Sequence, residues 1–490
     1  MARVSHELYR LQDLPDAWLA IPSASAIAPY ACLLSAHPKA ATQTAGNPTL
    51  TTGPILGHLV RLSIPASIGM VFNTLYNLTD FWFAGKLSAE ALAGVSIAGS
   101  VFFLLLAVGI GIQTGASALM AAEVGAGNQN KVADWADHVF GLSLVLSLVV
   151  AILGWFFAEP LVVFLGAEPA IAPLSMEYIT ITLVGAFTFI LSFAAAGALM
   201  AMGDTKSNRN ALVAGFFANL VLNPLLTFSL GLGVSGLATA TVLIKALSAL
   251  YLYRVLVQTL CRPCKPAFSL QPWIALLRQV LPASFNMLTI ILGGFVTVAL
   301  LGRFGSQHVA GYAVGLRIEQ VLLLPALGLN AAVMAIVGQN YGANNALRVR
   351  QTYMTSLGVG LCMAVVSIPV MLTLSPAMMA FFTDDPTIQA TGASYLRIDA
   401  FAFYAYVVLF ISTATLQAIK QPMFPMGLGI ARQLVVPVSI NVLLVVYLGS
   451  PMIWVFYTII SVVIVAAVLA HWYTLRQLHQ AIKASSVDPA

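Results

Sequence analysis

Charged residues are scarce in this sequence, at 8% of 490 positions, whereas soluble domains carry about 25%. Hydrophobic residues make up 60% of the chain. Such a chain cannot cover a water-facing surface with polar side chains, which excludes a soluble globular protein. Apolar stretches of about 20 residues recur along it, and each can cross a bilayer as a helix whose backbone hydrogen bonds are satisfied internally. The composition therefore predicts an all-α polytopic membrane protein.

Cysteines are also few, four in all, and they do not form a disulfide framework. Cys261 and Cys264 form a C-x-x-C pair; a metal or redox pair is one interpretation, and incidental reduced thiols are the favoured one. No Walker A motif, metal-ligand cluster or nucleophile–base pair occurs in the sequence, so we expect neither an enzyme nor a bound metal or cofactor. Any transport must then be driven by a gradient of an ion or of substrate.

Twelve apolar stretches are long enough to span a membrane, and the second, fourth, eighth and tenth exceed a minimal span. The predicted spans are 58–84, 91–122, 134–158, 173–202, 208–232, 235–259, 281–304, 308–340, 351–376, 388–419, 424–448 and 451–475. They divide the chain into an N-lobe of six spans (55–259), a polar, proline-containing linker (260–280) and a C-lobe of six spans (281–475). Residues 1–54 are predicted to be a disordered tail, or to follow a start codon placed too early, and residues 476–490 form a C-terminal tail.

The two lobes repeat each other at a constant offset of 217 residues. The matching positions are mainly prolines, glycines and charge changes, where helices begin, bend or stop: Pro65–Ser67 with Pro282–Ser284, Gly111 with Gly328, Gly125 with Gly342, Lys131 with Arg348, and Tyr178 with Tyr395. Because six spans return the chain to the side where it started, both lobes share one orientation. The sequence thus predicts two six-helix lobes related by a pseudo-two-fold axis along the membrane normal, with a cavity between them, as in secondary transporters.

Basic residues lie mainly on one side of the predicted bundle. Of the 22 lysines and arginines, thirteen fall in or beside one set of alternating loops and the C-terminal tail, and only Lys86 and Arg303 fall in the opposite set. Basic loops favour the cytoplasmic side, so both termini are predicted to be cytoplasmic, in the plasma (inner) membrane of the cell. The net charge of +5 therefore reflects orientation and implies no nucleic-acid partner.

Polar side chains gather at neighbouring levels of three N-lobe spans. An ionisable group at bilayer depth costs about 2.5–3.5 kcal/mol, so it usually has a partner or faces a cavity. The group comprises Asn73, Asn77, Asp80, Asn219, Asn223, Thr241 and Lys245. Spacings of three and four residues place the members of each span on one helix face. One interpretation is a site that binds a cation or proton at Asp80; the other is that these groups only hold helices together by hydrogen bonds.

The C-lobe carries different polar residues, since Thr297 occupies the position of Asp80. Arg317, Glu319 and Asp399 lie at similar depth in the eighth and tenth spans. They are predicted to form an internal charge cluster or a second cation site, and a structural pairing of Arg317 with either acid fits the sequence equally well. Four aromatic residues flank the tenth-span acid and either pack or line an apolar pocket for organic cations: Phe401, Phe403, Tyr404 and Tyr406.

Four stretches carry a family resemblance that covers residues 55–480: Pro65 through LYNLTDFWFAGKL (75–87), LMAMGDTKSNRN (199–210), NLVLNPLLTFSLGLGVSGLATAT (219–241) and VGQNYGANN (337–345). Taken together they are specific, and the chain resembles the multidrug and toxic compound extrusion (MATE) transporters, most of all their DinF-like branch. The resemblance implies two six-helix lobes that work by alternating access and export drug-like organic cations or amphiphiles against an inward flow of H⁺ or Na⁺.

The resemblance also implies functions for individual residues. Asp80 matches the first-helix carboxylate that is the family's usual candidate for proton binding, Asn219 matches the fifth-helix Asn, and Thr241 matches the sixth-helix Thr. Asn223 stands where some members have Asp, so the implied cation/proton site has one titratable group fewer. The seventh-helix Glu of the NorM-like branch has no counterpart after Pro282, and this favours H⁺ over Na⁺ as the coupling ion.

A proton-coupled antiporter is therefore the first hypothesis, with protonation of Asp80 leading to substrate release outward. The alternative is a flippase for lipid-linked saccharides from the same wider superfamily, which would need a basic cavity such as Lys245, Arg317 and Arg397 could line. The twelve spans and the four matching stretches favour the antiporter. Its expected partners are small-molecule substrates, a coupling ion and the lipid bilayer, and we expect it to act as a monomer.

Overall fold

The structure, a computed structural model, describes residues 50–487, so the predicted tail (1–54) lies almost entirely outside the described residues. One compact unit, Pro48–Leu256 with Cys264–Ala490, contains the helical bundle. Its N-lobe comprises α3 (Ile55–Leu87), α4 (Ala89–Gly125), α5 (Gln129–Phe164), α6 (Ala172–Val184), α7 (Ala186–Ala201), α8 (Lys206–Pro224), the π-helical turn η2 (Leu225–Ser229) and α9 (Gly233–Leu260).

The C-lobe repeats this order of elements. It comprises α10 (Leu270–Leu301), η3 (Gly302–Phe304), α11 (Ser306–Gly342), α12 (Ala346–Ala380), α13 (Pro386–Asp399), η4 (Ala400–Ala402), α14 (Phe403–Ala418), α15 (Met423–Ile430), η5 (Ala431–Val435), α16 (Val436–Val442), η6 (Leu443–Tyr447) and α17 (Ile453–Val487). Within the described residues, eleven helical segments are long and apolar enough to cross a membrane, and α6 with α7, bent by 52°, makes a twelfth if the pair is one span. The predicted all-α polytopic fold is confirmed.

Two helices are longer than the sequence predicted. α10 begins at Leu270, inside the range expected to be linker, and α17 continues to Val487, beyond the expected end at residue 475. Pro272, one of the prolines in the range predicted to be linker, falls in the first turn of α10, where its missing N–H breaks no intrahelical hydrogen bond. Both extensions mix polar and apolar side chains, so they form helix outside the continuous hydrophobic stretch that hydropathy detects.

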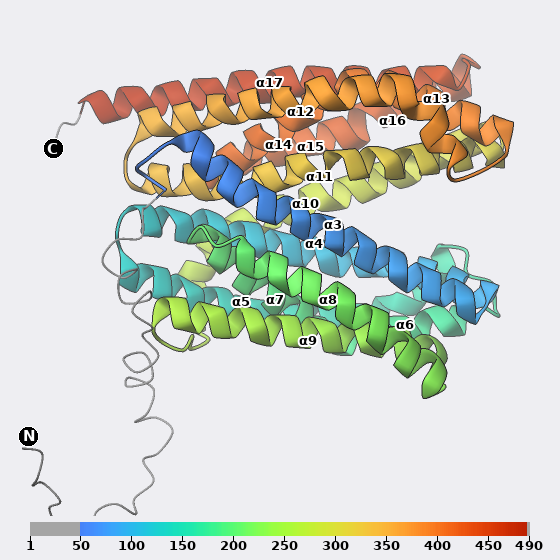
Figure 1. Cartoon of the computed structure of the whole chain (residues 1–490), viewed down its shortest axis with the longest axis horizontal. Helices are drawn as coiled ribbons and strands as arrows, with labels where there is room; N and C mark the ends of the chain where they lie inside the picture. The colour runs from blue at the N-terminus through green and yellow to red at the C-terminus, as the bar shows by residue number, and fades with distance from the viewer. Residues whose placement is uncertain (1–49, 488–490) are drawn as a thin grey trace, which may run out of the picture. The chain divides into compact units, whose positions relative to one another are not determined.

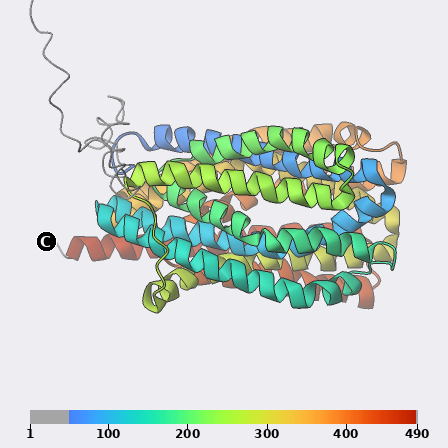
Figure 2. The same ribbon diagram turned by 90° about the horizontal axis from the view of Figure 1, so that it is seen from below.

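The two lobes lie as two layers of helices that run along a common direction. Figure 1 shows α4–α9 in one layer and α11–α17 in the other, with α3 lying across both, and the turned view in Figure 2 shows the same common direction. The start of α3 and the end of α17 lie at the same end of the bundle (Figure 1), as an even number of spans requires. The chain therefore crosses back to its starting side in each lobe.

Two close crossings between helices of different lobes are related by the 217-residue repeat. A Cβ added to Gly111 of α4 would lie 2.1 Å from the Ser284 hydroxyl of α10, and a Cβ added to Gly328 of α11 would lie 2.0 Å from the Ser67 hydroxyl of α3. Gly328 is Gly111 shifted by 217 positions, and Ser284 is Ser67 shifted by the same number. In each lobe a glycine thus contacts a serine-bearing helix of the other lobe. The two contacts are related by the 217-residue repeat, so the interface between the lobes has the symmetry that the sequence predicted.

We call the region where the C-terminal ends of α4 and α11 meet the closed end. There a Cβ on Gly125 would lie 1.8 Å from the backbone oxygen of Gln339, and one on Gly342 would lie 1.8 Å from that of Ala122. At the opposite ends of α4 and α11 the close glycine contacts stay inside one lobe, as for Gly94 against α6. The lobes therefore touch backbone to backbone at the closed end.

A short segment before α3, which we call the N-terminal latch (Leu50–Gly53), reinforces the closed end. Leu50 is buried, and its N–H donates to the Gln339 side-chain oxygen at 3.1 Å. Arg348 of α12 donates to the Thr52 and Gly53 carbonyl groups at 2.9 and 2.7 Å. Gln339 also donates to the Ala201 carbonyl oxygen of α7 at 2.8 Å. Side chains of the C-lobe thus hold both α7 and the start of α3 in the N-lobe.

Candidate functional site

Asp80 lies near the end of α3 and is buried, with three partners from two other helices. Asn219 and Asn223 of α8 donate through their amide groups to Asp80 Oδ1 at 2.7 and 2.8 Å. The Thr241 hydroxyl of α9 donates to Asp80 Oδ2 at 3.5 Å. All three partners are themselves buried. The structure therefore brings together the four residues that the sequence proposed as a cation/proton site.

The local sequence of α8 explains how its two amides reach Asp80. The buried residues of this helix recur every four positions and lie along one stripe: Ser207, Ala211, Gly215, Asn219 and Asn223. α3 approaches α8 closely at Gly69, where an added Cβ would lie 3.3 Å from the Arg209 backbone, and the two asparagines follow farther along α8 where the acid lies. Pro224 then interrupts the α-helical bonding, and the chain continues as the π-helical turn η2. Such turns are frequent at functional sites.

The two oxygens of the Asp80 carboxylate have different surroundings. Oδ1 accepts two short amide hydrogen bonds, whereas Oδ2 faces the Thr241 hydroxyl at the longer distance. The amide donors stabilise the negative charge, and a proton on Oδ2 could be donated to the Thr241 oxygen without breaking either amide bond. The side-chain oxygen of Asn223 has no hydrogen-bond partner although Asn223 is fully buried. The arrangement can therefore hold a proton or offer oxygen ligands to a cation.

The three residues expected to support this network do not contact Asp80. Asn77 is exposed, and Asn73 is half-buried. The Lys245 ammonium lies over the rings of Tyr76 and Phe189, at 5.7 and 5.9 Å from their centroids, and no carboxylate among residues 50–487 forms an ion pair with it. The charges of Lys245 and Asp80 still act on each other electrostatically, although no hydrogen bond or ion pair joins the two side chains.

Tyr76 is the residue that sequence reasoning missed in the N-lobe. It precedes Asp80 by one helical turn and is buried, and its hydroxyl has no hydrogen-bond partner among the described residues. With Lys245, Asn73 and residues of α8, it lines a cavity of about 10 Å³, which is roughly the room of one water molecule. The spacing of four residues from Asp80 was the available sign that Tyr76 shares its helix face.

The C-lobe holds two buried acids whose partners are tyrosines. The Tyr395 hydroxyl of α13 donates to the Glu319 carboxylate of α11, and the Tyr406 hydroxyl of α14 donates to Asp399 Oδ1 at 3.3 Å. Asp399 Oδ2 is buried without a hydrogen-bond partner. The sequence predicted both acids but not Tyr395, although its match with Tyr178 in the repeat marked it as a shared position. Of the four flanking aromatic residues, only Tyr406 contacts Asp399 through a hydrogen bond.

Arg317 does not join this C-lobe cluster, which corrects the pairing considered from sequence. It is exposed, whereas Glu319 two positions later is buried, because residues two apart on a helix point to opposite sides. The basic side chain whose charge acts on Glu319 is Arg432, in the π-helical turn η5. A helix register alone could not reveal it, since Arg432 comes from a segment more than a hundred residues away.

A second buried asparagine repeats the position of Asn223. Asn441 of α16 precedes the turn η6 by two residues, as Asn223 precedes η2, and both share the pattern N-x-L-L. Its side-chain oxygen is likewise buried without a partner. The match was hidden because it needs an offset of 218 rather than 217 residues. Among the described residues, no group of three His, Cys, Asp or Glu side chains could hold a metal ion.

Comparison with known proteins identifies the family. A sequence model of the MatE family matches residues 65–225 and 282–443, one segment in each lobe, and the two segments begin 217 residues apart. The chain belongs to the MatE family. MatE proteins are membrane transporters and not enzymes, and the family includes multidrug exporters. The predicted MATE resemblance is confirmed at the level of the family.

Curated relatives and solved structures match this MatE chain over most of their own length. It is 28% identical to a FAD transporter of Shewanella oneidensis, over 78% of this chain and 86% of that protein. It is 25% identical to a probable multidrug resistance protein of Bacillus subtilis, YpnP, over 73% of this chain and 81% of the relative. A solved multidrug resistance MATE transporter in an outward-facing conformation has a TM-score of 0.82 at 26% identity and covers 88% of this chain and 98% of its own.

Proposed function

We propose that this MatE protein exports drug-like organic cations or amphiphiles in exchange for protons, and that Asp80 carries the proton. The observation that supports this most directly is the asymmetry of the Asp80 carboxylate, which has one oxygen held by two amides and the other facing a hydroxyl. Both protonation states then have hydrogen-bond partners inside the bundle. A carboxylate locked in an ion pair would favour only the charged state. The Lys245 charge acts on Asp80 electrostatically, but among the described residues no ion pair joins the two.

Coupling requires that the site bind protons differently in the two conformations of the transport cycle. α3 supplies the physical link, because it carries Asp80 near one end, and at the other it follows the N-terminal latch and crosses α11 at Ser67. Protonation converts two charge-assisted hydrogen bonds into neutral ones, which are roughly half as strong. α3 is then held less firmly to α8, and the equilibrium between a closed and an open latch shifts.

The closed end faces the cytoplasm in this proposal. Basic side chains gather at the helix ends on this side: Lys131, Arg209, Arg348, Arg350 and Arg476. Basic residues are retained on the cytoplasmic side of membrane proteins, so both termini are cytoplasmic. The conformation is then the outward-facing one, because the two lobes touch at the cytoplasmic end. The DinF-like branch remains our assignment, on the four matching sequence stretches.

The C-lobe acids are proposed as a second titrating pair. Glu319 and Asp399 are both buried and each accepts a tyrosine hydroxyl, and one oxygen of Asp399 has no partner. Two buried carboxylates that lie near each other resist being ionised together. The pair is therefore suited to bind one proton or another cation per cycle, in addition to the one at Asp80.

A second substrate class is favoured by one relative and one side chain. The Shewanella oneidensis relative is named a FAD transporter. Lys245 is half-buried and interacts with Asp80 only electrostatically, and its ammonium lies over the rings of Tyr76 and Phe189. An ammonium beside aromatic rings suits the phosphates and flat ring system of a flavin dinucleotide. Lys245→Ala should then lower FAD transport severalfold and leave transport of a cationic dye unchanged.

Transport into proteoliposomes with separately imposed H⁺ and Na⁺ gradients tests the proposal. We expect the H⁺ gradient alone to drive transport of a fluorescent organic cation, and Asp80→Asn to abolish it. Glu168→Gln is the matched control, since Glu168 is an exposed carboxylate and this change alters the net charge equally. Transport driven by Na⁺ alone would reject proton coupling. Undiminished, gradient-dependent export by the Asp80→Asn protein would remove Asp80 from the mechanism.

A further inference from the structure

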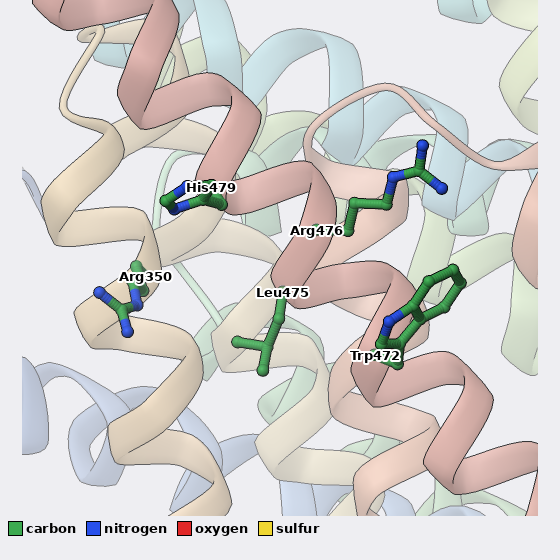
Figure 3. A pocket seen from close by; sticks show the side chains of 5 residues that line it. All are labelled: Arg350, Trp472, Leu475, Arg476 and His479. Atoms are coloured by element: carbon green, nitrogen blue, oxygen red, sulfur yellow. The ribbon is translucent and has the colours of Figure 1, made fainter.

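A cavity away from the carboxylates lies between two helices of the C-lobe. It measures about 320 Å³ and is lined by Arg350 of α12 and by Trp472, Leu475, Arg476 and His479 of α17. Figure 3 shows Arg350 on the neighbouring helix and the other four side chains on successive turns of α17. Their spacing of three and four residues places them on one face of that helix.

Among the residues that the structure describes, no acidic side chain lines this cavity. It contains two guanidinium groups and an imidazole, and neither α12 nor α17 has an aspartate or glutamate anywhere along its length. Arg476 lies over the Trp472 ring, 5.7 Å from its centroid, and no carboxylate among residues 50–487 pairs with it or with Arg350. Arginines concentrated in one cavity repel each other, so an anion that fills the cavity would stabilise this arrangement.

The position along the helices indicates where that anion comes from. Trp472 is 56% exposed and lies where the apolar run of α17 gives way to Arg476 and His479. Tryptophan is enriched at this boundary, because its ring lies among the headgroups and upper acyl chains. Leu475 adds an apolar contact at the same depth. The cavity therefore joins a cationic part, at headgroup level, to an apolar part that continues into the hydrocarbon.

We propose that this cavity binds the phosphodiester headgroup of an anionic phospholipid from the leaflet at the closed end. Arg350 and Arg476 contact the phosphate oxygens, for which the planar guanidinium is suited, and an acyl chain lies along Trp472 and Leu475. Basic pockets between membrane helices on the cytoplasmic side recognise anionic headgroups in this way. The bound lipid bridges α12, which carries Arg348 of the latch contact, to α17. The site does not depend on the coupling ion or the transported substrate.

Native mass spectrometry of the delipidated full chain tests this site, with phosphatidylglycerol and phosphatidylcholine of equal acyl length as probes. We expect phosphatidylglycerol to bind at least about tenfold more tightly, as a difference of 1.4 kcal/mol requires. Arg350→Gln combined with Arg476→Gln should remove this preference. Arg254→Gln combined with Arg278→Gln is the matched control, because both arginines are exposed and the same charge is lost elsewhere.

Three results would overturn the assignment. The first is an equal loss of preference in both double variants, which would indicate attraction to the whole basic surface. The second is an unchanged preference in the Arg350/Arg476 variant. The third is competition in which inorganic phosphate displaces the lipid as readily as phosphatidylglycerol does, which would make the cavity a general anion site. Because each readout compares two lipids on the same protein, a change in folding yield does not imitate the expected result.

Discussion

Replacing Asp80 by Asn separates the two effects of this carboxylate, on folding and on proton coupling. The carboxylate accepts amide hydrogen bonds from Asn219 and Asn223. Hydrogen bonds to a charged group contribute about 1.5–3 kcal/mol each and neutral ones about 0.5–1.5 kcal/mol, so the substitution weakens each bond by about 1–1.5 kcal/mol. It also removes the cost of burying a charge, which is several kcal/mol. We expect Asp80→Asn to be as stable as the wild type, or more stable, and inactive in proton-driven export.

Asn219→Ala should do the opposite for stability. It leaves the buried Asp80 charge without one of its short donors, at a cost of about 1–3 kcal/mol in the free energy of unfolding. In the double variant Asp80→Asn/Asn219→Ala the charge is absent. There the Asn219→Ala change should lower the free energy of unfolding by less than it does in the wild type, the difference being about 1 kcal/mol or more. Thermal unfolding in detergent measures stability, and dye export by proteoliposomes under an imposed pH gradient measures function. The wild type should follow that gradient and Asp80→Asn should not respond to it.

The reasoning would be refuted by either of two results. One is a strongly destabilised Asp80→Asn protein that retains export, since the carboxylate would then be structural only. The other is an additive cycle, in which Asn219→Ala costs the same free energy with Asp80 and with Asn at position 80. Additivity would mean that the amide and the carboxylate do not interact in the protein, contrary to their distance of 2.7 Å.

Three further substitutions test the interface and the C-lobe. Arg348→Ala removes three hydrogen bonds to the latch, one of them long at 3.4 Å, which together contribute about 1–2 kcal/mol in this partly exposed setting. The change should therefore shift the closed–open equilibrium about five- to thirty-fold toward the open latch, measured as faster thiol labelling of a cysteine placed at the closed end. Gly125→Ala places a Cβ against the backbone oxygen of Gln339 and should separate α4 from α11. The separation should be seen as a longer distance between spin labels on the two helices, and export should be at least about tenfold slower. Tyr395→Phe removes the donor to the buried α11 acid and should lower the free energy of unfolding by about 1–3 kcal/mol in thermal melts.

Each of these substitutions has a control at a comparable position. Lys131→Ala matches Arg348→Ala in the repeat and should leave labelling unchanged, because Lys131 is exposed and outside the latch. Gly358→Ala should be neutral, since nothing lies within 4 Å of the added Cβ. Tyr447→Phe is the control for Tyr395→Phe, because Tyr447 is 76% exposed. An equal effect of any control and its partner would contradict the specific contact proposed for that partner.

The structure shows which features of the fold the hydropathy and the repeat of the sequence predict, and which they do not. Hydropathy identified the spans because backbone groups in lipid must be bonded within a helix, whatever its neighbours are. It failed at Leu270 and beyond residue 475, where helix continues through residues of mixed polarity. The repeat offset predicted equivalent positions, and Gly111 and Gly328 indeed make equivalent crossings.

The sequence predicted less well which side chains share a site. Spacing by four residues placed Asn219 and Asn223 on one stripe of α8, and both do reach Asp80. The same rule suggested Asn77 as a supporting residue, but Asn77 is exposed. A membrane helix is apolar on all sides, so its sequence does not show which face turns inward.

The sequence by itself predicted the all-α polytopic fold and the duplication, and it singled out Asp80 as the acid proposed to bind a proton, because each follows from local chemistry and from spacing along one chain. Only the tertiary structure decided the partners of the charged groups, such as Lys245 over aromatic rings and Glu319 with Tyr395. Such contacts depend on the rotation of each helix about its axis and on packing between residues far apart in sequence. Neither quantity is encoded in the periodicity of a single span.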